Sequence, residues 1–144
     1  MHPLILKYGE LTLSVFVKTR TQDGSAGPYF DWLKCHVKAS AKTMSTDFHW
    51  NVMPQELLRF ADDLSGLFNE YPKRGSFEFR PSEPNVVLTF AIGSKGQVEG
   101  TYELRDDFLT PIVVKGSFEV DQNSLERGAS SVRGFVNSLK SGAT

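Results

Sequence analysis

Residues 86–104 read VVLTFAIGSKGQVEGTYEL, and this stretch decides the fold. Apolar side chains alternate with polar or small ones from Val86 to Ile92 and again from Val98 to Leu104. This is the period of two that is typical of half-buried strands. Between them, Ser94-Lys95-Gly96 is typical of a three-residue hairpin loop, because glycine stands where the backbone must be left-handed. The turn and the alternation therefore predict one register, in which Ile92 pairs with Val98.

A third strand extends this pattern, because the alternation resumes at Ile112 and continues to Val120. We therefore expect residues 83–120 to form a three-stranded antiparallel meander. The predicted register places Phe90 opposite Gly100 and, through the second hairpin, opposite Gly116. One aromatic ring would then cover two glycines, a known packing arrangement in sheets. The other face of these strands is polar, so we expect part of this sheet to face solvent.

The rest of the chain supplies further strands and two helices. Strands are predicted over residues 11–18, 29–39, 48–52 and 76–80, with a loop over residues 19–28 and a turn over residues 42–44. Pro54 opens an amphipathic helix, with Glu56 near the positive end of its dipole. A second helix is predicted to begin at a capping box formed by Asn123 and Glu126 and to run to Lys140.

These elements predict one α+β domain over residues 1–144. We expect an antiparallel sheet or an open sandwich of about eight strands, packed by two helices, in the order strands, helix, strands, helix. A chain of this length buries enough apolar surface to need no disulfide or metal for stability.

Composition disfavours several classes of partner. The chain has 16 Lys and Arg against 17 Asp and Glu, a net charge of −1, and its basic residues are scattered. We therefore expect no nucleic-acid partner, because phosphate binding needs a concentrated basic surface. The single cysteine, Cys35, cannot form an internal disulfide and suits a reducing compartment. Residues 1–6 lack a basic signal-peptide region, so we expect a cytoplasmic protein without a membrane anchor.

Residues with catalytic or metal-binding chemistry form no convincing constellation. His36, His49 and Asp47 could form a metal site from neighbouring strands, but they also fit the wetter faces of strands, and we predict no metal. Cys35 and His36 are adjacent on a strand and point to opposite faces, so they cannot form a thiol and base pair locally. No phosphate-binding or dinucleotide motif occurs. We therefore predict no cofactor and no catalytic residue.

Paired carboxylates are the remaining candidates for acid or base chemistry. Asp62-Asp63 is predicted on the solvent side of the first helix, where charge favours solubility. Asp106-Asp107 follows the strand that ends near Leu104, a common place for turn-forming aspartates. A carboxylate acts in proton transfer when burial or a close like charge raises its pKa. The sequence around the two aspartate pairs indicates neither of these conditions. We expect neither pair to be catalytic.

Three short patterns, in this order, resemble the WapI-type immunity proteins of bacterial contact-dependent and polymorphic toxin systems. The first is Asp31-Trp32-Leu33-Lys34-Cys35-His36-Val37, and the second is Trp50 followed by a helix with Glu56-Leu57 near its start. The third is Phe77-Glu78-Phe79, then Glu83-Pro84-Asn85 and Leu88-Thr89-Phe90. A closely similar group of bacterial domains would share these patterns.

The resemblance implies a non-catalytic cytoplasmic protein that binds and blocks a cognate toxin domain, often a nuclease. A strongly acidic inhibitor would associate fastest with a basic nuclease, and the near-neutral charge of this chain departs from that expectation. The candidate binding surface combines the polar sheet face with the adjoining loop and consists of Glu99, Glu103, Arg105, Asp106 and Asp107. The same residues also fit a plain solvated face.

Two other functions remain open from the sequence. A ligand-binding or enzyme domain would have a pocket over the sheet near Gly100 and Gly116, where missing side chains could leave a void. A secretion chaperone would be a dimer with an exposed apolar strip. The oligomeric state and the identity of the partner do not follow from the sequence.

Overall fold

The computed structural model describes residues 2–22, 31–73 and 75–141 of the chain. Its elements are β1 (Leu4–Tyr8), β2 (Leu11–Gln22), β3 (Asp31–Ala41), β4 (Met44–Val52), α1 (Pro54–Glu70), β5 (Ser76–Phe79), β6 (Val86–Ile92), β7 (Val98–Arg105), β8 (Val113–Val120) and α2 (Asn123–Ser141). The predicted α+β class and the order strands, helix, strands, helix are confirmed.

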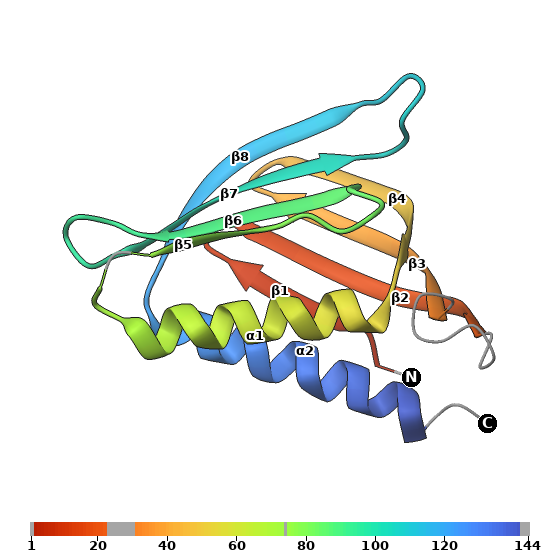
Figure 1. Cartoon of the computed structure of the whole chain (residues 1–144). Helices are drawn as coiled ribbons and strands as arrows, with labels where there is room; N and C mark the ends of the chain where they lie inside the picture. Colours follow the sequence, from red (N-terminus) through yellow and green to blue (C-terminus); the bar gives the residue numbers. More distant parts are fainter. Residues whose placement is uncertain (1, 23–30, 74, 142–144) are drawn as a thin grey trace.

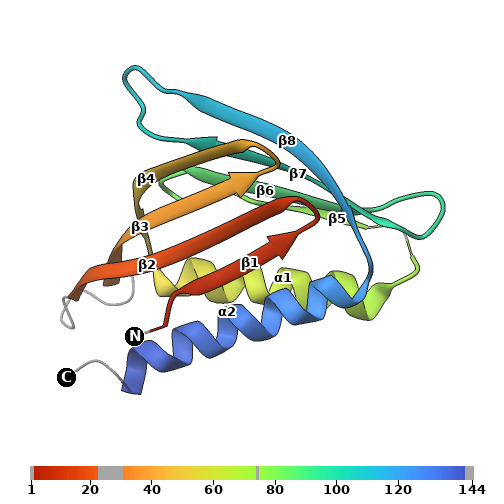
Figure 2. The same ribbon diagram turned by 180° about the vertical axis from the view of Figure 1, so that it is seen from behind.

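The strands form two four-stranded antiparallel sheets, and each sheet follows the order of the chain. The first sheet has the order β1-β2-β3-β4 and the second has the order β5-β6-β7-β8. Helices α1 and α2 run side by side along one side of the molecule (Figures 1 and 2). The arrangement is the open sandwich predicted from the sequence, with the second sheet built on the meander.

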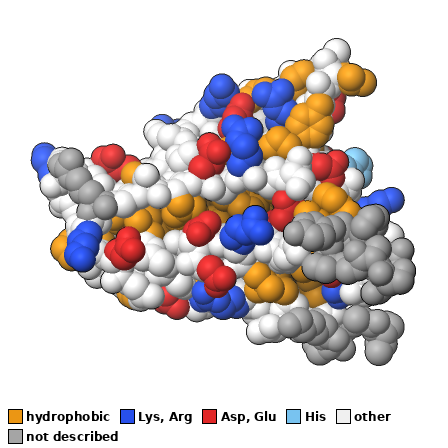
Figure 3. Space-filling view, in the orientation of Figure 1, with side chains coloured by type: hydrophobic (Ala, Val, Ile, Leu, Met, Phe, Trp, Pro, Cys, Tyr) orange, Lys and Arg blue, Asp and Glu red, His pale blue; other side chains and the backbone are white. Residues whose placement is uncertain are grey.

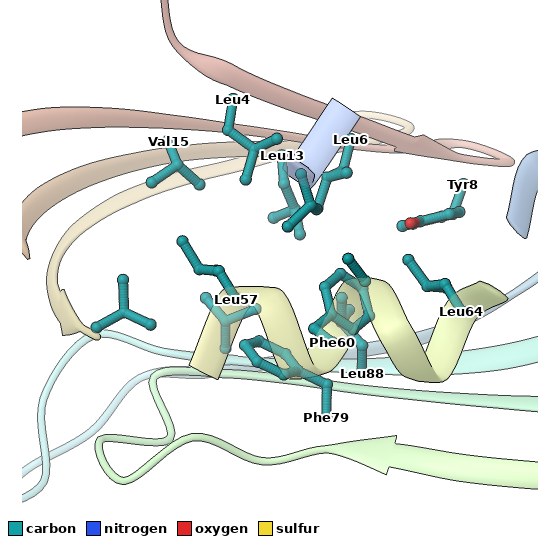
Figure 4. Packing of buried hydrophobic residues seen from close by; sticks show 14 of the residues in the cluster. Leu4, Leu6, Tyr8, Leu13, Val15, Leu57, Phe60, Leu64, Phe79 and Leu88 are labelled. Carbon is teal, nitrogen blue, oxygen red and sulfur yellow. The ribbon is translucent and has the colours of Figure 1, made fainter. Parts of the chain in front are cut away.

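The hydrophobic core lies between the two sheets and α1. One face of α1 is apolar at a spacing of three and four residues, and it buries Leu57, Phe60 and Leu64. Figure 4 shows these side chains between Leu6 and Leu13 of the first sheet and the residues of the second sheet, Phe79 and Leu88. Both sheets therefore depend on α1 for their mutual packing.

The register predicted for the first hairpin of the meander is confirmed, and the second part of that prediction is wrong. Ile92 pairs with Val98 and Phe90 with Gly100, and Gly96 has a φ of 81°. Gly116, however, pairs with Tyr102, and it is Phe118 that lies opposite Gly100 on β8. A Cβ on Gly100 would overlap the Phe118 ring, and a Cβ on Gly116 would overlap the Tyr102 ring. Two rings thus cover the two glycines.

Several element boundaries differ from the sequence interpretation. Residues 4–8 lie outside the predicted strands, but they form β1, because Leu4, Leu6 and Tyr8 alternate inward. Strand β2 continues to Gln22, so residues 19–22 are not loop, and the rest of the predicted loop lies outside the described residues. Strand β8 begins at Val113, which leaves Ile112 in the preceding loop and 70% exposed.

The start of α2 is capped differently from the prediction. The Ser124 amide donates to Oδ1 of Asp121 at 3.0 Å, so the acceptor comes from Asp121 and not from the predicted box of Asn123 and Glu126. Glu126 instead accepts a hydrogen bond from the Ser65 hydroxyl of α1 at 3.5 Å. Glu126 therefore contributes to the contact between the two helices.

Candidate functional site

The outer face of the second sheet is polar and open to solvent. Its residues alternate with the core side chains and are Ser76, Glu78, Val87, Thr89, Ala91, Glu99, Thr101, Glu103, Arg105, Val113, Lys115, Ser117 and Glu119. Val87 is buried, and the others are half-buried or exposed. Both described helices lie on the other side of this sheet (Figures 1 and 2). The structure thus brings Glu99, Glu103 and Arg105 together on one accessible face, as the alternation predicted.

A small cluster of charges surrounds Glu103 on this face. Its Oε1 lies 3.4 Å from a guanidinium nitrogen of Arg105 and 3.7 Å from Nζ of Lys115 on β8. Glu103 and Arg105 are half-buried and Lys115 is exposed, and ion pairs that remain open to solvent in this way contribute only about 0.2–1 kcal/mol to stability. The cluster therefore leaves its charged groups free to exchange partners on binding at little cost.

Glu99 stands directly opposite Glu119 on the neighbouring strand β8. Both side chains are exposed, and Glu99 accepts a hydrogen bond from Nε2 of Gln97 at 2.8 Å. In the part of the chain that the structure describes, neither carboxylate forms an ion pair with a cation. Like charges opposite each other destabilise a strand pair. This acidic pair therefore does not contribute to the stability of the sheet.

The two aspartates of the predicted site hold the loop between β7 and β8, residues 106–112, which we call the tip loop. Oδ1 of Asp106 accepts from the amides of Asp107 and Ile112, each at 2.8 Å. Oδ1 of Asp107 accepts from the amides of Leu109 at 3.0 Å and Thr110 at 2.9 Å. These bonds are the turn-forming interactions expected of aspartate, and they fix the loop backbone.

The base of the tip loop is fixed by a buried asparagine at the start of the meander. Asn85 is 5% exposed, and its Nδ2 donates to the carbonyl oxygens of Arg105 at 2.9 Å and Asp106 at 3.5 Å. The Arg105 amide donates to the Asn85 carbonyl at 2.9 Å. The loop is therefore held by Asp106 and Asp107 from within and by Asn85 at its base.

The tip loop exposes apolar side chains that the sequence interpretation missed. Phe108 is 49% exposed, Leu109 95% and Ile112 70%. The loop projects from the body of the molecule in Figure 1, and hydrophobic side chains gather at this projecting end in Figure 3. The available signal was the apolar pair Phe108-Leu109 directly after Asp107, at a position where a turn normally carries polar residues.

Trp50 and Glu56, two of the residues that carried the family resemblance, hold the corner between β5 and β6. Nε1 of Trp50 donates to the Glu83 carbonyl at 2.9 Å. Glu56 is 8% exposed and accepts from the Met53 amide at 3.0 Å and from the Ser82 amide at 2.6 Å. These residues therefore join β4, the start of α1 and the second sheet. They fix the corner from which β6 enters the second sheet.

The alternative interpretation places a pocket over the sheet near Gly100 and Gly116. On the core side, the space left by these glycines is occupied by the Phe118 and Tyr102 rings. On the opposite side of the sheet, an open hollow of about 580 Å³ is lined by Thr89, Ala91, Glu99, Gly100, Thr101, Ser117, Phe118 and Glu119. It is part of the outer face itself. We therefore treat it as the concave centre of the candidate surface.

The histidines considered as metal ligands meet on the outer face of the first sheet. His36 pairs with His49 across the strands with ring centroids 5.4 Å apart, and Nε2 of His36 lies 3.5 Å from Oδ1 of Asp47. Nevertheless, the described residues contain no group of three His, Cys, Asp or Glu side chains placed to hold a metal ion. No described helix is long and apolar enough to cross a membrane.

The remaining sequence candidates for acid or base chemistry are separated in the structure. Cys35 is 2% exposed, and burial raises the pKa of its thiol to about 12, so the reactive thiolate is disfavoured. Asp62 pairs with Arg133 of α2 at 3.1 Å. Burial is the main cause that raises the pKa of Asp63. Asp62 thus lies at the contact between the helices, and both aspartates are on α1, away from the outer face of the second sheet.

The sequence model of the Immunity protein WapI-like family matches residues 5–139, which is nearly the whole chain. The chain belongs to this family. The WapI-like resemblance inferred from the three short patterns, which begin at Asp31, Trp50 and Phe77, is therefore confirmed. Comparison with the curated proteins finds no match.

Comparison with solved structures finds the plant transcriptional regulator PBF-2. It shares 10% sequence identity with this WapI-like protein, and the superposition covers 96% of this chain and 86% of the plant chain with a TM-score of 0.41. A likeness at this level carries no argument about fold or function. The family match is thus the comparison that bears on function.

Proposed function

We propose that this protein is an immunity protein that binds and neutralises a cognate bacterial toxin domain through the outer face of the second sheet and the tip loop. The observation that carries the proposal is the family match over residues 5–139, together with an open, charged sheet face. Glu99, Glu103, Arg105, Asp106 and Asp107 are the proposed contact residues. Asp106 and Asp107 act chiefly by holding the loop that the partner meets.

The proposal includes a non-catalytic mechanism in the cytoplasm. Neutralisation by binding requires only that the complex dissociate more slowly than the toxin meets its target. A rigid binding surface is sufficient for this, and no reaction on this chain is needed. The buried thiol of Cys35 and the dispersed carboxylates support a role without chemistry at this chain. The reduced single cysteine and the family membership favour the compartment in which a toxin that enters a bacterial cell would act.

The test is co-expression with the toxin domain encoded beside this gene. We expect the wild-type protein to restore growth of a bacterial host that produces this toxin domain, and the purified proteins to form a stable complex by calorimetry. The triple variant Glu99→Ala, Glu103→Ala, Arg105→Ala should weaken the complex at least tenfold. If the wild-type protein failed to restore growth, or if the two purified proteins formed no complex, the proposed function would be refuted.

The opposite sheet offers a matched control. Lys34, Lys38 and Asp47 are exposed on the outer face of the first sheet, and they also comprise three charged side chains of mixed sign. The variant Lys34→Ala, Lys38→Ala, Asp47→Ala should bind the toxin domain as the wild type does. Equal weakening by the two triple variants would mean that the second sheet is not the preferred surface.

A further inference from the structure

Exposed apolar surface is concentrated on the tip loop. Among the described residues, the large hydrophobic side chains that are exposed are Ile5, Met44, Phe108, Leu109 and Ile112. Three of these five lie within five consecutive residues of one loop, and the other two lie on separate strands of the first sheet. Single exposed hydrophobic residues need no explanation, whereas a cluster of them marks an interaction site.

The tip loop is held in one conformation before any partner binds. Asp106 and Asp107 accept four backbone hydrogen bonds within the loop, and Asn85 binds its base. Loop ordering is one of the costs of association, and a loop that is already ordered avoids this cost. An apolar side chain such as Leu109, presented on a fixed backbone, is suited to enter a preformed pocket.

Charge is distributed unequally between the two sheets. The outer face of the second sheet carries Glu78, Glu99, Glu103 and Glu119 against Arg105 and Lys115, whereas the outer face of the first sheet carries Lys7, Lys34 and Lys38 against Asp47. The net charge of −1 therefore conceals an acidic face and a basic face. The unpaired Glu99 and Glu119 would gain most from a cation placed above them.

We propose that Phe108 and Leu109 of the tip loop insert into an apolar pocket on the cognate toxin domain, and that a basic surface on the same domain covers Glu99 and Glu119, which lie about 20 Å away at the opposite end of β7 and β8. This inference rests on the proposed function and specifies its surface. The partner is thus a protein domain with a net positive binding face, which is the charge that a domain acting on nucleic acid carries. The near-neutral total charge of the chain does not contradict such a partner.

Two other occupants fit the same features less well. An anionic membrane attracts basic segments, but the outer face of the second sheet as a whole carries four glutamates against Arg105 and Lys115, so a membrane would repel this face. A second copy of the chain joined through the same face would bring together two faces that each carry four glutamates against Arg105 and Lys115, and like net charges across an interface are unfavourable. A basic protein domain satisfies both the apolar tip loop and the acidic pair.

The first experiment measures binding of the full chain to a catalytically inactive variant of the toxin domain encoded beside this gene. The variant Phe108→Ser, Leu109→Ser should weaken binding about 100-fold or more, because buried aromatic and aliphatic anchors dominate such interfaces. Met44→Ser is the matched control, since Met44 is 58% exposed on β4 of the other sheet. It should change the affinity less than twofold. Both variants should unfold at the wild-type urea concentration.

The second experiment tests the acidic pair. The variant Glu99→Gln, Glu119→Gln should slow association at low salt by about tenfold and reduce its dependence on salt concentration. The control Asp47→Asn, Glu70→Gln removes the same charge from the other sheet and from the end of α1. It should leave the association rate within twofold of the wild type.

The outcomes separate this inference from the proposed function. Tight binding by the Phe108→Ser, Leu109→Ser variant would overturn the inference alone, whereas failure of the wild type to bind would overturn the proposed function. Sedimentation of the wild type with vesicles of anionic phospholipid, abolished by the same variant, would assign the tip loop to a membrane and overturn the inference. The inference would also be overturned if light scattering showed the wild type to be a dimer and the Phe108→Ser, Leu109→Ser variant to be a monomer.

Discussion

The hydroxyl group of Tyr8 on β1 lies against the backbone of α2 at Gly128, where a Cβ atom would stand 2.5 Å from the hydroxyl oxygen. Tyr8 is 1% exposed, and its ring contacts Phe90 and Phe118 with centroid separations of 5.0 and 5.2 Å. Within the described residues its hydroxyl group has no hydrogen-bond partner. The glycine therefore lets α2 approach the edge of the first sheet closely enough to bury this ring.

Replacing Gly128 by alanine should destabilise the protein. Alanine favours a helix by about 1 kcal/mol over glycine, but forcing a methyl group into a packed contact costs about 1–3 kcal/mol. We expect a net loss in the free energy of unfolding, measured with urea. In the Tyr8→Phe background the clashing oxygen is gone, so the same Gly128→Ala change should cost nothing or stabilise.

Gly134 on the same helix is the control for this prediction. A Cβ at Gly134 would meet no atom within 4 Å. Gly134→Ala should therefore stabilise the protein by up to about 1 kcal/mol in either background. Equal effects of Gly128→Ala and Gly134→Ala would show that the contact between Tyr8 and Gly128 does not limit helix packing.

Replacing Glu56 by alanine should destabilise the protein by about 2–4 kcal/mol. The buried carboxylate accepts hydrogen bonds from the Met53 and Ser82 amides, and its loss leaves two donors without their acceptor. Urea unfolding measures the change. The exposed Glu70, at the other end of α1, is the control, and Glu70→Ala should change the free energy of unfolding by less than about 0.5 kcal/mol.

The sequence predicts the first hairpin of the meander well, because two independent signals agree there. The alternation fixes which side chains of β6 and β7 face inward, and the loop ending in Gly96 admits one register. The hairpin between β7 and β8 has no such turn signal. Its seven-residue connection left the position of Gly116 undetermined, and the assumed pairing with Phe90 proved wrong.

The candidate site could be predicted only where it depends on strand alternation. Glu99, Glu103 and Arg105 follow the period of two and lie together on the outer face as predicted. The exposure of Leu109 does not follow any period, because it depends on how Asp106 and Asp107 bind the loop backbone. Likewise, the hydrogen bonds of Asn85 link residues 20 positions apart and carry no local pattern.

Replacing Asp107 by alanine should loosen the tip loop without unfolding the protein. The carboxylate holds the amides of Leu109 and Thr110, so both amides should exchange with solvent at least tenfold faster in hydrogen exchange followed by NMR. Core amides of β6 should exchange as in the wild type. Unchanged exchange at Leu109 would show that the loop conformation does not depend on this side chain.

Burial of Cys35 should make the stability of the protein fall above pH 9. The thiol has an ordinary pKa of 9.0, and burial raises the pKa of Cys35 to about 12 in the folded protein. Between these values the unfolded chain loses the proton and the folded chain keeps it, so unfolding becomes more favourable as the pH rises. The stabilisation is fully present below pH 9 and is lost progressively towards pH 12.

The variant Cys35→Ala isolates this contribution, because alanine has no proton to lose and all other groups titrate alike in both proteins. The difference in the free energy of unfolding between wild type and variant should shift by about 1.4 kcal/mol, to the disadvantage of the wild type, between pH 8 and pH 10. Urea unfolding under reducing conditions measures it. The pKa of Tyr8 is also raised by burial, from 10.0, but that group is present in both proteins and cancels. A difference that stays constant over this range would mean that the thiol ionises as readily in the folded chain as in the unfolded one, which is incompatible with its place in the core between Leu33 and Val37.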